Sequence, residues 1–178
     1  NFMAGAVEND AGRPSVEAPL HNIINTKFVV HTHPFLVNGL TCAKDGEAFA
    51  KQLFPDALWV EYIDAGYTLS VELKGRIEQY TAEHGKGPKV ILLKNHGIFV
   101  AADTADEIRS LYAGVMDAVK LEYEKAGIQA GLEIAEAEAA PEFEEQIQQV
   151  FEADAQHVVS SGMFTHVPGP ITPDHLVY

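Results

Sequence analysis

Two histidines separated by one residue, His31 and His33, are the strongest chemical signal in the sequence. They end a β-branched and aromatic run, Lys27 to His33, that is typical of a buried strand. Side chains two residues apart in a strand point to the same face, so both imidazoles would aim at one point. Zinc binds neutral histidine nitrogens, and a catalytic zinc commonly has three protein ligands. A pair of partly exposed strand histidines without a metal is the alternative, with about equal weight.

A third histidine and one glutamate could complete such a site. His96 follows the apolar run Val90 to Lys94 in an Asn-His-Gly turn, and polar residues at strand ends often lie on a functional rim. Glu17 falls in the predicted first turn of a helix, whose positive end favours an ionised carboxylate. A carboxylate beside a metal can also move protons. Taken singly, a turn histidine bonded to backbone and a plain helix-terminal charge explain these residues at least as well.

His21 lies four residues after Glu17, on the same face of that predicted helix. We expect it to support the ligands or to face a substrate, and a hydrogen-bonded structural histidine is the alternative. The sequence has neither a glycine-rich nucleotide loop nor a GxSxG nucleophile turn. The one cysteine, Cys42, has no nucleophile context and is interpreted as a small packed side chain.

Strand and helix patterns that alternate along the chain would position these residues. Ser15 is a predicted helix N-cap, and Thr104 followed by Glu107 predicts a capping box. Strands separated by helices predict a layered α/β domain whose sheet could be mixed or antiparallel. We expect strands at 27–33, 57–63, 90–94 and 98–101, and helices at 15–24, 47–53, 70–83, 104–125 and 142–160.

The composition is that of a globular chain without features for binding nucleic acid or membranes. Twelve basic residues face 26 acidic ones, and the net charge of -14 repels nucleic-acid phosphates and anionic lipid heads. The sequence has no apolar run long enough for a membrane span and no secretion signal. A single cysteine suits a reducing cytoplasm, so we expect a cytoplasmic protein. Any phosphorylated substrate would need a local positive pocket.

Several of these segments, in their order along the chain, resemble the class II aldolase/adducin family. The matching segments are Arg13 to Glu17 (RPSVE), His21, His31 to Pro34 (HTHP) and Leu92 to Gly97 (LLKNHG). This order is more specific than any one segment alone. The segment Pro14 to His21 (PSVEAPLH) followed by HTHP looks most similar to the aldolase part of bifunctional rhamnulose-1-phosphate aldolase/short-chain dehydrogenase proteins.

The resemblance implies a three-layer α/β/α domain with a central, mostly antiparallel sheet. It also implies that Glu17 is the catalytic acid/base residue and that Ser15 helps to bind the phosphate of the substrate, beside which we expect His21 to face the substrate. The implied ligands of a divalent metal ion, expected to be zinc, are Glu17, His31, His33 and His96.

The implied reaction is the aldol cleavage of a ketose 1-phosphate to dihydroxyacetone phosphate and an aldehyde. Zinc would hold the carbonyl and adjacent hydroxyl oxygens and stabilise the enediolate, while Glu17 would move protons. The related epimerases usually carry aspartate at the position of Glu17, so glutamate favours aldol cleavage. A zinc-dependent sugar-phosphate epimerase or a decarboxylating relative is the second interpretation. A non-catalytic metal-binding or assembly domain is the third.

The resemblance also predicts the domain organisation and the partners. Residues 1–127 would form the metal-binding domain, shortened at its N-terminus because only sixteen residues precede Glu17. Residues 128–178 would form a helical extension and tail packed on the same domain. The family's catalytic tyrosines often come from a neighbouring subunit, and Tyr62 and Tyr67 are candidates. We therefore expect a small phosphorylated sugar as the substrate. We also expect a homo-oligomer, with a tetramer as one form that it could take.

Overall fold

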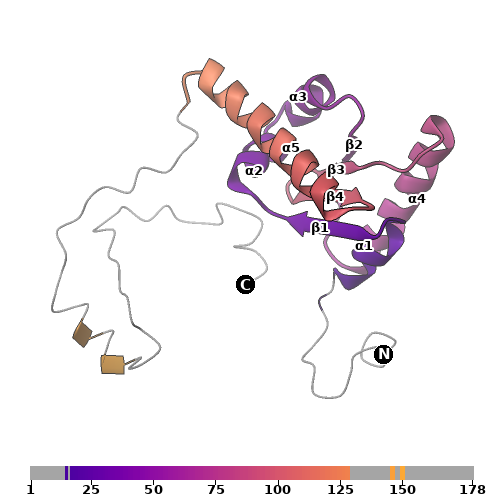
Figure 1. The fold of residues 1–178 in the computed structure, drawn as a ribbon, viewed down its shortest axis with the longest axis horizontal. Coiled ribbons are helices and arrows are strands. Elements are labelled where there is room, and N and C mark those ends of the chain that lie inside the picture. The colour runs from indigo at the N-terminus through magenta and orange to yellow at the C-terminus, as the bar shows by residue number, and fades with distance from the viewer. Residues whose placement is uncertain (1–14, 16, 129–144, 147–148, 151–178) are drawn as a thin grey trace.

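The computed structural model describes residues 15, 17–128, 145–146 and 149–150. Figure 1 shows the order of the elements along this part of the chain. The elements are α1 (Ala18–Ile23), β1 (Phe28–Thr32), α2 (Phe35–Thr41), α3 (Gly46–Leu53), β2 (Leu58–Val60), α4 (Tyr67–His84), β3 (Val90–Leu93), β4 (Gly97–Ala102) and α5 (Ala105–Lys125).

The strands form one sheet in the order β1-β4-β3-β2. The connection from β3 to β4 is a short turn, so these strands run antiparallel, and β4 also pairs antiparallel with β1. The connection from β2 to β3 contains α4, and such a helical crossover allows the parallel pairing that these strands make. The sheet is therefore mixed, with two antiparallel pairings and one parallel pairing.

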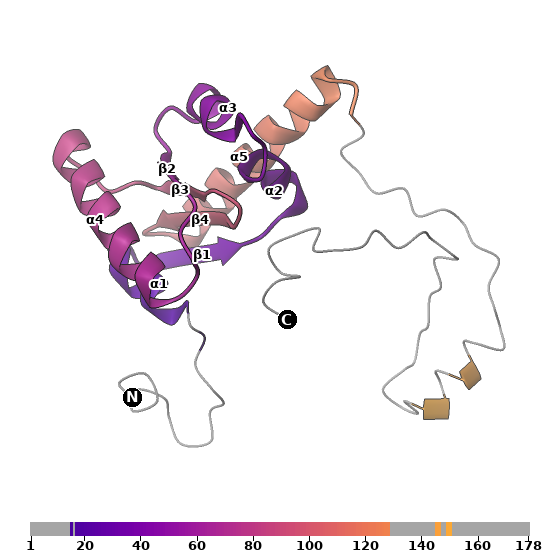
Figure 2. The same cartoon turned by 180° about the vertical axis from the view of Figure 1, so that it is seen from behind.

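Alternate side chains of the central strands point to opposite faces of the sheet, and each face is covered by helices. Leu93 and Phe99 pack with Leu20 of α1 and Leu73 of α4. Leu92, Ile98 and Val100 pack on the other face, with residues of α2 and α5. Figures 1 and 2, seen from the two sides, show the sheet between these helix pairs. The expected three-layer α/β/α arrangement is confirmed.

Most of the expected elements are present, and their ends follow local signals. Gly85, in the left-handed conformation that glycine adopts readily, ends α4. The Thr104 hydroxyl accepts a hydrogen bond from the Glu107 amide at 3.2 Å, so the predicted cap of α5 is confirmed. Strand β2 has only three residues, which is shorter than its seven-residue apolar pattern.

Four sequence-based expectations need correction. Helix α1 begins at Ala18, so Glu17 occupies its N-cap position and Ser15 lies before the helix. Strand β1 is only partly buried because, within the described chain, it pairs with β4 alone. Helix α2 was not expected: its seven residues include Gly39 and Asn38, weak helix formers, so packing of Val37 rather than local propensity stabilises it. Cys42 is exposed rather than packed.

The predicted helix at 142–160 and the following tail lie largely outside the described residues. The same holds for the expected packing of residues 128–178 on the domain. Within the part of the chain that the structure describes, no helix combines the length and apolar character that crossing a membrane requires.

Candidate metal centre

Glu17, His31, His33 and His96 meet at one edge of the sheet. His31 lies near the end of β1, and His33 follows that strand directly. His96 immediately precedes β4, the antiparallel neighbour of β1, so the end of one strand and the start of the other lie side by side. Glu17 reaches the same edge from the start of α1. Their four candidate ligand atoms all lie within 4.8 Å of one another.

The distances within this cluster are those of groups that share one small volume. The Nε2 atom of His31 lies 3.0 Å from that of His33 and 3.3 Å from that of His96. The Glu17 Oε1 atom lies 2.9 Å from His96 Nε2 and 3.5 Å from His31 Nε2. The His31 and His96 side chains are 5% and 11% exposed, so little water reaches between them.

Hydrogen bonding sets the orientation of the His31 ring. Its Nδ1 atom lies 2.9 Å from the carbonyl oxygen of Ile98. A carbonyl oxygen only accepts, so Nδ1 carries the hydrogen and, in the neutral ring, Nε2 keeps its lone pair. The ring also stacks on Phe99 at 4.0 Å between centroids. His31 is therefore held with a free electron pair directed at the other ligand atoms, as metal-binding histidines usually are.

The charge of Glu17 suits a cation at this point. Its contacts with the His31 ring, and then with the His96 ring, hold the pKa of the Glu17 carboxyl far below its usual value. Burial raises that pKa, but the two histidine contacts outweigh it. The carboxylate is thus ionised at neutral pH. Electron pairs on neighbouring Nε2 atoms repel one another unless a proton or a cation lies among them, so this donor set fits a divalent metal ion.

A glycine supports the cluster by leaving room for one of its rings. A Cβ atom at Gly97 would lie 2.5 Å from His33 Cδ2 and 2.5 Å from the Thr32 carbonyl oxygen. Only glycine fits there without a shift of backbone or ring. The role of Gly97 escaped the sequence analysis, although its place directly after His96 was a signal.

Two further contacts fasten the strand and loop that carry the histidines. The Thr32 and Tyr112 hydroxyls lie 3.1 Å apart and share a hydrogen bond, which links β1 to α5. The side-chain amide of Asn38 donates to the His33 carbonyl oxygen at 3.4 Å. Neither residue pair was singled out from the sequence, because each contact joins segments whose proximity depends on the fold.

The expected substrate residues Ser15 and His21 each contact one residue of the cluster without belonging to it. The Ser15 hydroxyl accepts a hydrogen bond from the Glu17 amide at 3.1 Å, at an exposed position. His21 is also exposed, and its ring centroid lies 6.5 Å from that of His31. Tyr62 and Tyr67 are 55% and 81% exposed, and the Tyr62 hydroxyl donates to Asp64.

Comparison with known proteins places this arrangement in a family. Residues 2–123 match the family described as class II aldolase and adducin N-terminal domain. The chain belongs to the class II aldolase/adducin family. The match covers the four clustered residues and every described strand, so the edge of the sheet described above is part of this class II aldolase-type domain.

Individual relatives cover parts of the chain. A structure of the N-terminal class II aldolase domain of a conserved Thermoplasma acidophilum protein shares 23% identity, with a TM-score of 0.55, over 65% of this chain and 51% of that one. An aldolase II superfamily protein from Pseudomonas syringae shares 22% identity, with a TM-score of 0.41, over 66% of this chain and 47% of that one.

Among curated proteins, "Uncharacterized oxidoreductase YuxG" of Bacillus subtilis (strain 168) is 27% identical over 101 residues. This match spans 56% of the chain described here but only 14% of the Bacillus protein. The chain also spans only 51% of the Thermoplasma structure. The chain therefore spans only part of the length of the proteins that it matches.

Proposed function

We propose that this domain is a metal-dependent aldolase that cleaves a ketose 1-phosphate to dihydroxyacetone phosphate and an aldehyde. The observation that carries the proposal is the convergence of three imidazole nitrogens and one carboxylate oxygen within 4.8 Å of one another. Membership in the class II aldolase/adducin family supports it.

The proposed ligands are Glu17, His31, His33 and His96, and zinc is the proposed metal because it accepts this mixture of nitrogen and oxygen donors. A bound divalent cation would supply Lewis-acid stabilisation of the negative charge that develops on substrate oxygens during aldol cleavage.

Glu17 has the second role, proton transfer. Its carboxylate is ionised at neutral pH, and the oxygen that does not bind the cation would be the one that accepts a proton. With a side chain that is 23% exposed, it can contact both the ligand cluster and an incoming substrate. His21 and Ser15, exposed beside it, are the proposed substrate contacts.

A homo-oligomer would allow a tyrosine of one chain to reach the metal site of its neighbour. Tyr62 and Tyr67 are exposed here, and we propose that such a tyrosine completes the site of a neighbouring subunit in the aldolase. A tetramer is possible, and the assembly can be measured independently of activity by light scattering.

The test is product analysis with the full chain and added Zn2+. The protein is incubated separately with rhamnulose-1-phosphate, fuculose-1-phosphate and ribulose-5-phosphate. We expect dihydroxyacetone phosphate and an aldehyde from one of the first two. Glu17→Gln keeps the shape of the side chain and should lower turnover by about 10² to 10⁴-fold, the usual contribution of a proton-transfer group.

Two results would contradict the proposal. A pentulose phosphate epimer, formed from ribulose-5-phosphate without cleavage, would identify an epimerase. A folded, metal-loaded chain without turnover of any of the three sugars would identify a binding or assembly domain. His84→Ala, which changes a histidine at the end of α4 outside the cluster, serves as the matched control and should keep activity.

A further inference from the structure

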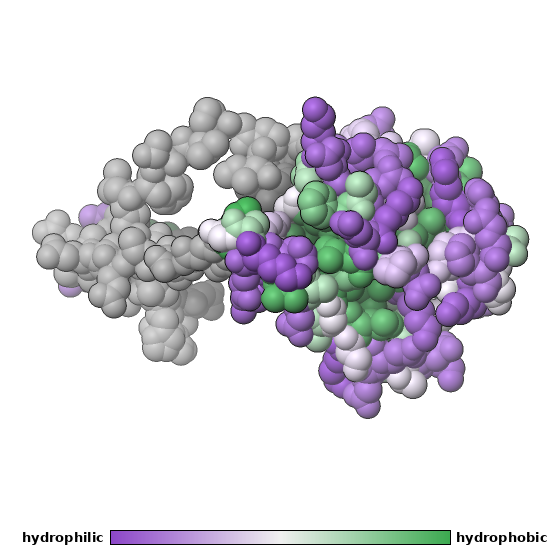
Figure 3. Space-filling model, turned by 90° about the horizontal axis from the view of Figure 1, so that it is seen from above, coloured by the Kyte–Doolittle hydropathy of each residue, from purple (hydrophilic) through white to green (hydrophobic). Residues whose placement is uncertain are grey.

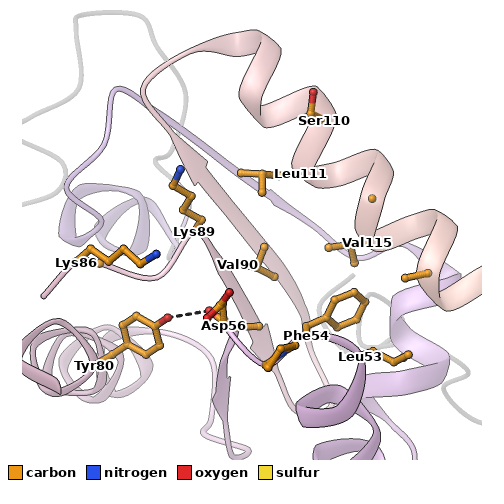
Figure 4. A pocket seen from close by; sticks show the side chains of 15 residues that line it. Leu53, Phe54, Asp56, Tyr80, Lys86, Lys89, Val90, Ser110, Leu111 and Val115 are labelled. Carbon is orange, nitrogen blue, oxygen red and sulfur yellow. Dashed lines mark hydrogen bonds between the residues drawn. The ribbon is translucent and has the colours of Figure 1, made fainter. Parts of the chain in front are cut away.

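A second hollow lies at the end of β3 away from the histidine cluster. Val90, the first residue of β3, lines it, whereas His96 follows the last residue of that strand. Its volume is about 490 Å3, and its walls come from α5, from the connection between α3 and β2 and from the connection between α4 and β3 (Figure 4). The proposed aldolase chemistry uses none of the side chains that line it.

One end of this hollow, which we call the α5 groove, is apolar. Phe54 and Leu53 lie opposite Leu111 and Val115 of α5 in Figure 4. Gly114 faces open space, with no atom within 4 Å of a Cβ built on it, so a second helix could approach α5 closely there. Figure 3, which views the molecule from the side where α3 lies in Figure 1, shows apolar surface in a hollow ringed by hydrophilic residues.

The other end of the groove is polar. Lys89 forms an ion pair with Glu107. Lys86 makes no hydrogen bond or ion pair within the described part of the chain, and Asp56 is the acidic residue of the lining. Among the described residues of the lining, Lys86 is thus the lysine left for an ion pair, and an occupant that joins an apolar stripe to a nearby carboxylate could contact both ends of the groove.

The chain itself contains such a segment. Residues 129–178 carry nine acidic residues and no lysine or arginine. Within them, the segment 142–160 has Phe143, Ile147 and Phe151 at spacings of four, which would put them on one face of the predicted helix. Val150, also in this segment, is 75% exposed.

The segment is long enough and close enough to reach the groove. The sixteen residues 126–141 that follow α5 can span up to about 50 Å when extended. The path back along α5 from Lys125 to Gly114 is about 16 Å at the rise of a helix. Covalent attachment gives a short-tethered segment an effective concentration in the millimolar range, which favours it over a second copy of the chain.

We propose that the segment 142–160 docks in the α5 groove, with its apolar side on Phe54, Leu111 and Val115 and its acidic residues near Lys86. This contact is independent of the metal centre and of the aldolase reaction. It would cover the partly buried apolar lining of the α5 groove and join the C-terminal part of the chain to the domain.

Disulfide trapping in the full chain tests the proposal. In a Cys42→Ser background, Gly114→Cys and Ile147→Cys are combined and oxidised at low protein concentration. The matched control pairs Ile147→Cys with Gly75→Cys, because Gly75 lies on α4 and also faces open space. We expect an intramolecular disulfide to form roughly tenfold faster with Gly114→Cys than with Gly75→Cys, since docking raises the local concentration.

Equal rates for the two pairs would overturn the proposal. Dimers that form through Gly114→Cys alone would also overturn it, because they would assign the groove to a second copy of the chain. A small molecule that co-purifies with the protein, seen by native mass spectrometry, and occupies the groove would overturn it as well. Hydrogen exchange gives a second reading that needs no cysteine. Ile147→Asp with Phe151→Asp should raise exchange in residues 110–118, and unchanged exchange there in a folded variant would also contradict docking.

Discussion

At the scale of single residues, the candidate metal centre depends on how each ring is held as much as on which residues are present. The Ile98 carbonyl sets the His31 tautomer, and the Phe99 ring fixes its plane. Gly97 leaves the space that the His33 ring occupies. Because these contacts already set the orientations of the rings, metal binding would need little further free energy to order them.

The first prediction concerns metal content. His31→Ala with His33→Ala should leave little metal in the purified protein, whereas the unchanged chain should carry close to one equivalent, because two of the four proposed donors are gone. Inductively coupled plasma mass spectrometry measures both. His84→Ala is the control, since His84 stacks on Tyr80 outside the cluster. An equal metal content in the double variant and in the unchanged chain would contradict the assignment of these histidines as ligands.

The second prediction concerns Gly97. Gly97→Ala should lower the free energy of unfolding by about 1–3 kcal/mol and weaken metal binding, because its Cβ would overlap His33 and the Thr32 backbone. Urea unfolding and a metal titration measure the two effects. Gly75→Ala, in an open position within α4, should instead be neutral or stabilising. A Gly97→Ala protein as stable and as metal-binding as the original would show that this contact relaxes freely.

At the scale of elements, the antiparallel pairing of β1 with β4 brings the cluster together. It sets the end of β1 beside the start of β4, so His31 and His33 meet His96, which lies in the turn before β4. Helix α5 then fastens this edge through Tyr112 and anchors α2 through Tyr123, whose hydroxyl donates to the Leu36 carbonyl at 3.1 Å. The burial that raises the Tyr123 pKa reflects this packed position.

These two tyrosines allow a paired test. Tyr112→Phe and Tyr123→Phe should each lower the free energy of unfolding by about 1 kcal/mol, the usual net value of one hydrogen bond. Only Tyr112→Phe should also weaken metal binding, because its partner Thr32 lies between His31 and His33. Chemical unfolding and metal titration of both variants measure this. If the two variants bind metal equally well, α5 has no part in positioning the histidines.

At the scale of the whole molecule, the cluster joins parts of the chain that are distant in sequence. Glu17 lies 79 residues before His96, and each belongs to a different part of the fold. A cation held by both would connect the start of α1 with the sheet. It would therefore stabilise the folded domain, because the unfolded chain does not present the four donors together.

Metal removal should make this visible. At free metal about 100-fold above its dissociation constant, binding adds about 2.7 kcal/mol to the free energy of unfolding. For a domain of this size we expect a chelator to lower Tm by roughly 10 °C. Differential scanning calorimetry measures the shift. His31→Ala with His33→Ala should unfold at the same temperature with and without chelator, and an equal drop in both proteins would point to metal bound elsewhere.

The sequence by itself determined the features that depend on neighbours a few residues apart. The N-cap at Thr104, the stop of α4 at Gly85 and the common direction of His31 and His33 are local, so period and cap chemistry predicted them. The motif order also indicated the family and hence the three layers. For Glu17 and His96, however, residue chemistry alone favoured a purely structural role at least as strongly as metal binding.

Only the tertiary structure decided that Glu17 and His96 reach the same point as the strand histidines, because strand pairing and the packing of Leu20 are contacts between distant segments. The same reason explains α2, whose weak local propensity hid it, and the supports Gly97 and Tyr112. The burial of β1 also depended on the tertiary structure. Its apolar residues predicted a buried strand, but β1 lies at the edge of the described sheet and is only partly buried.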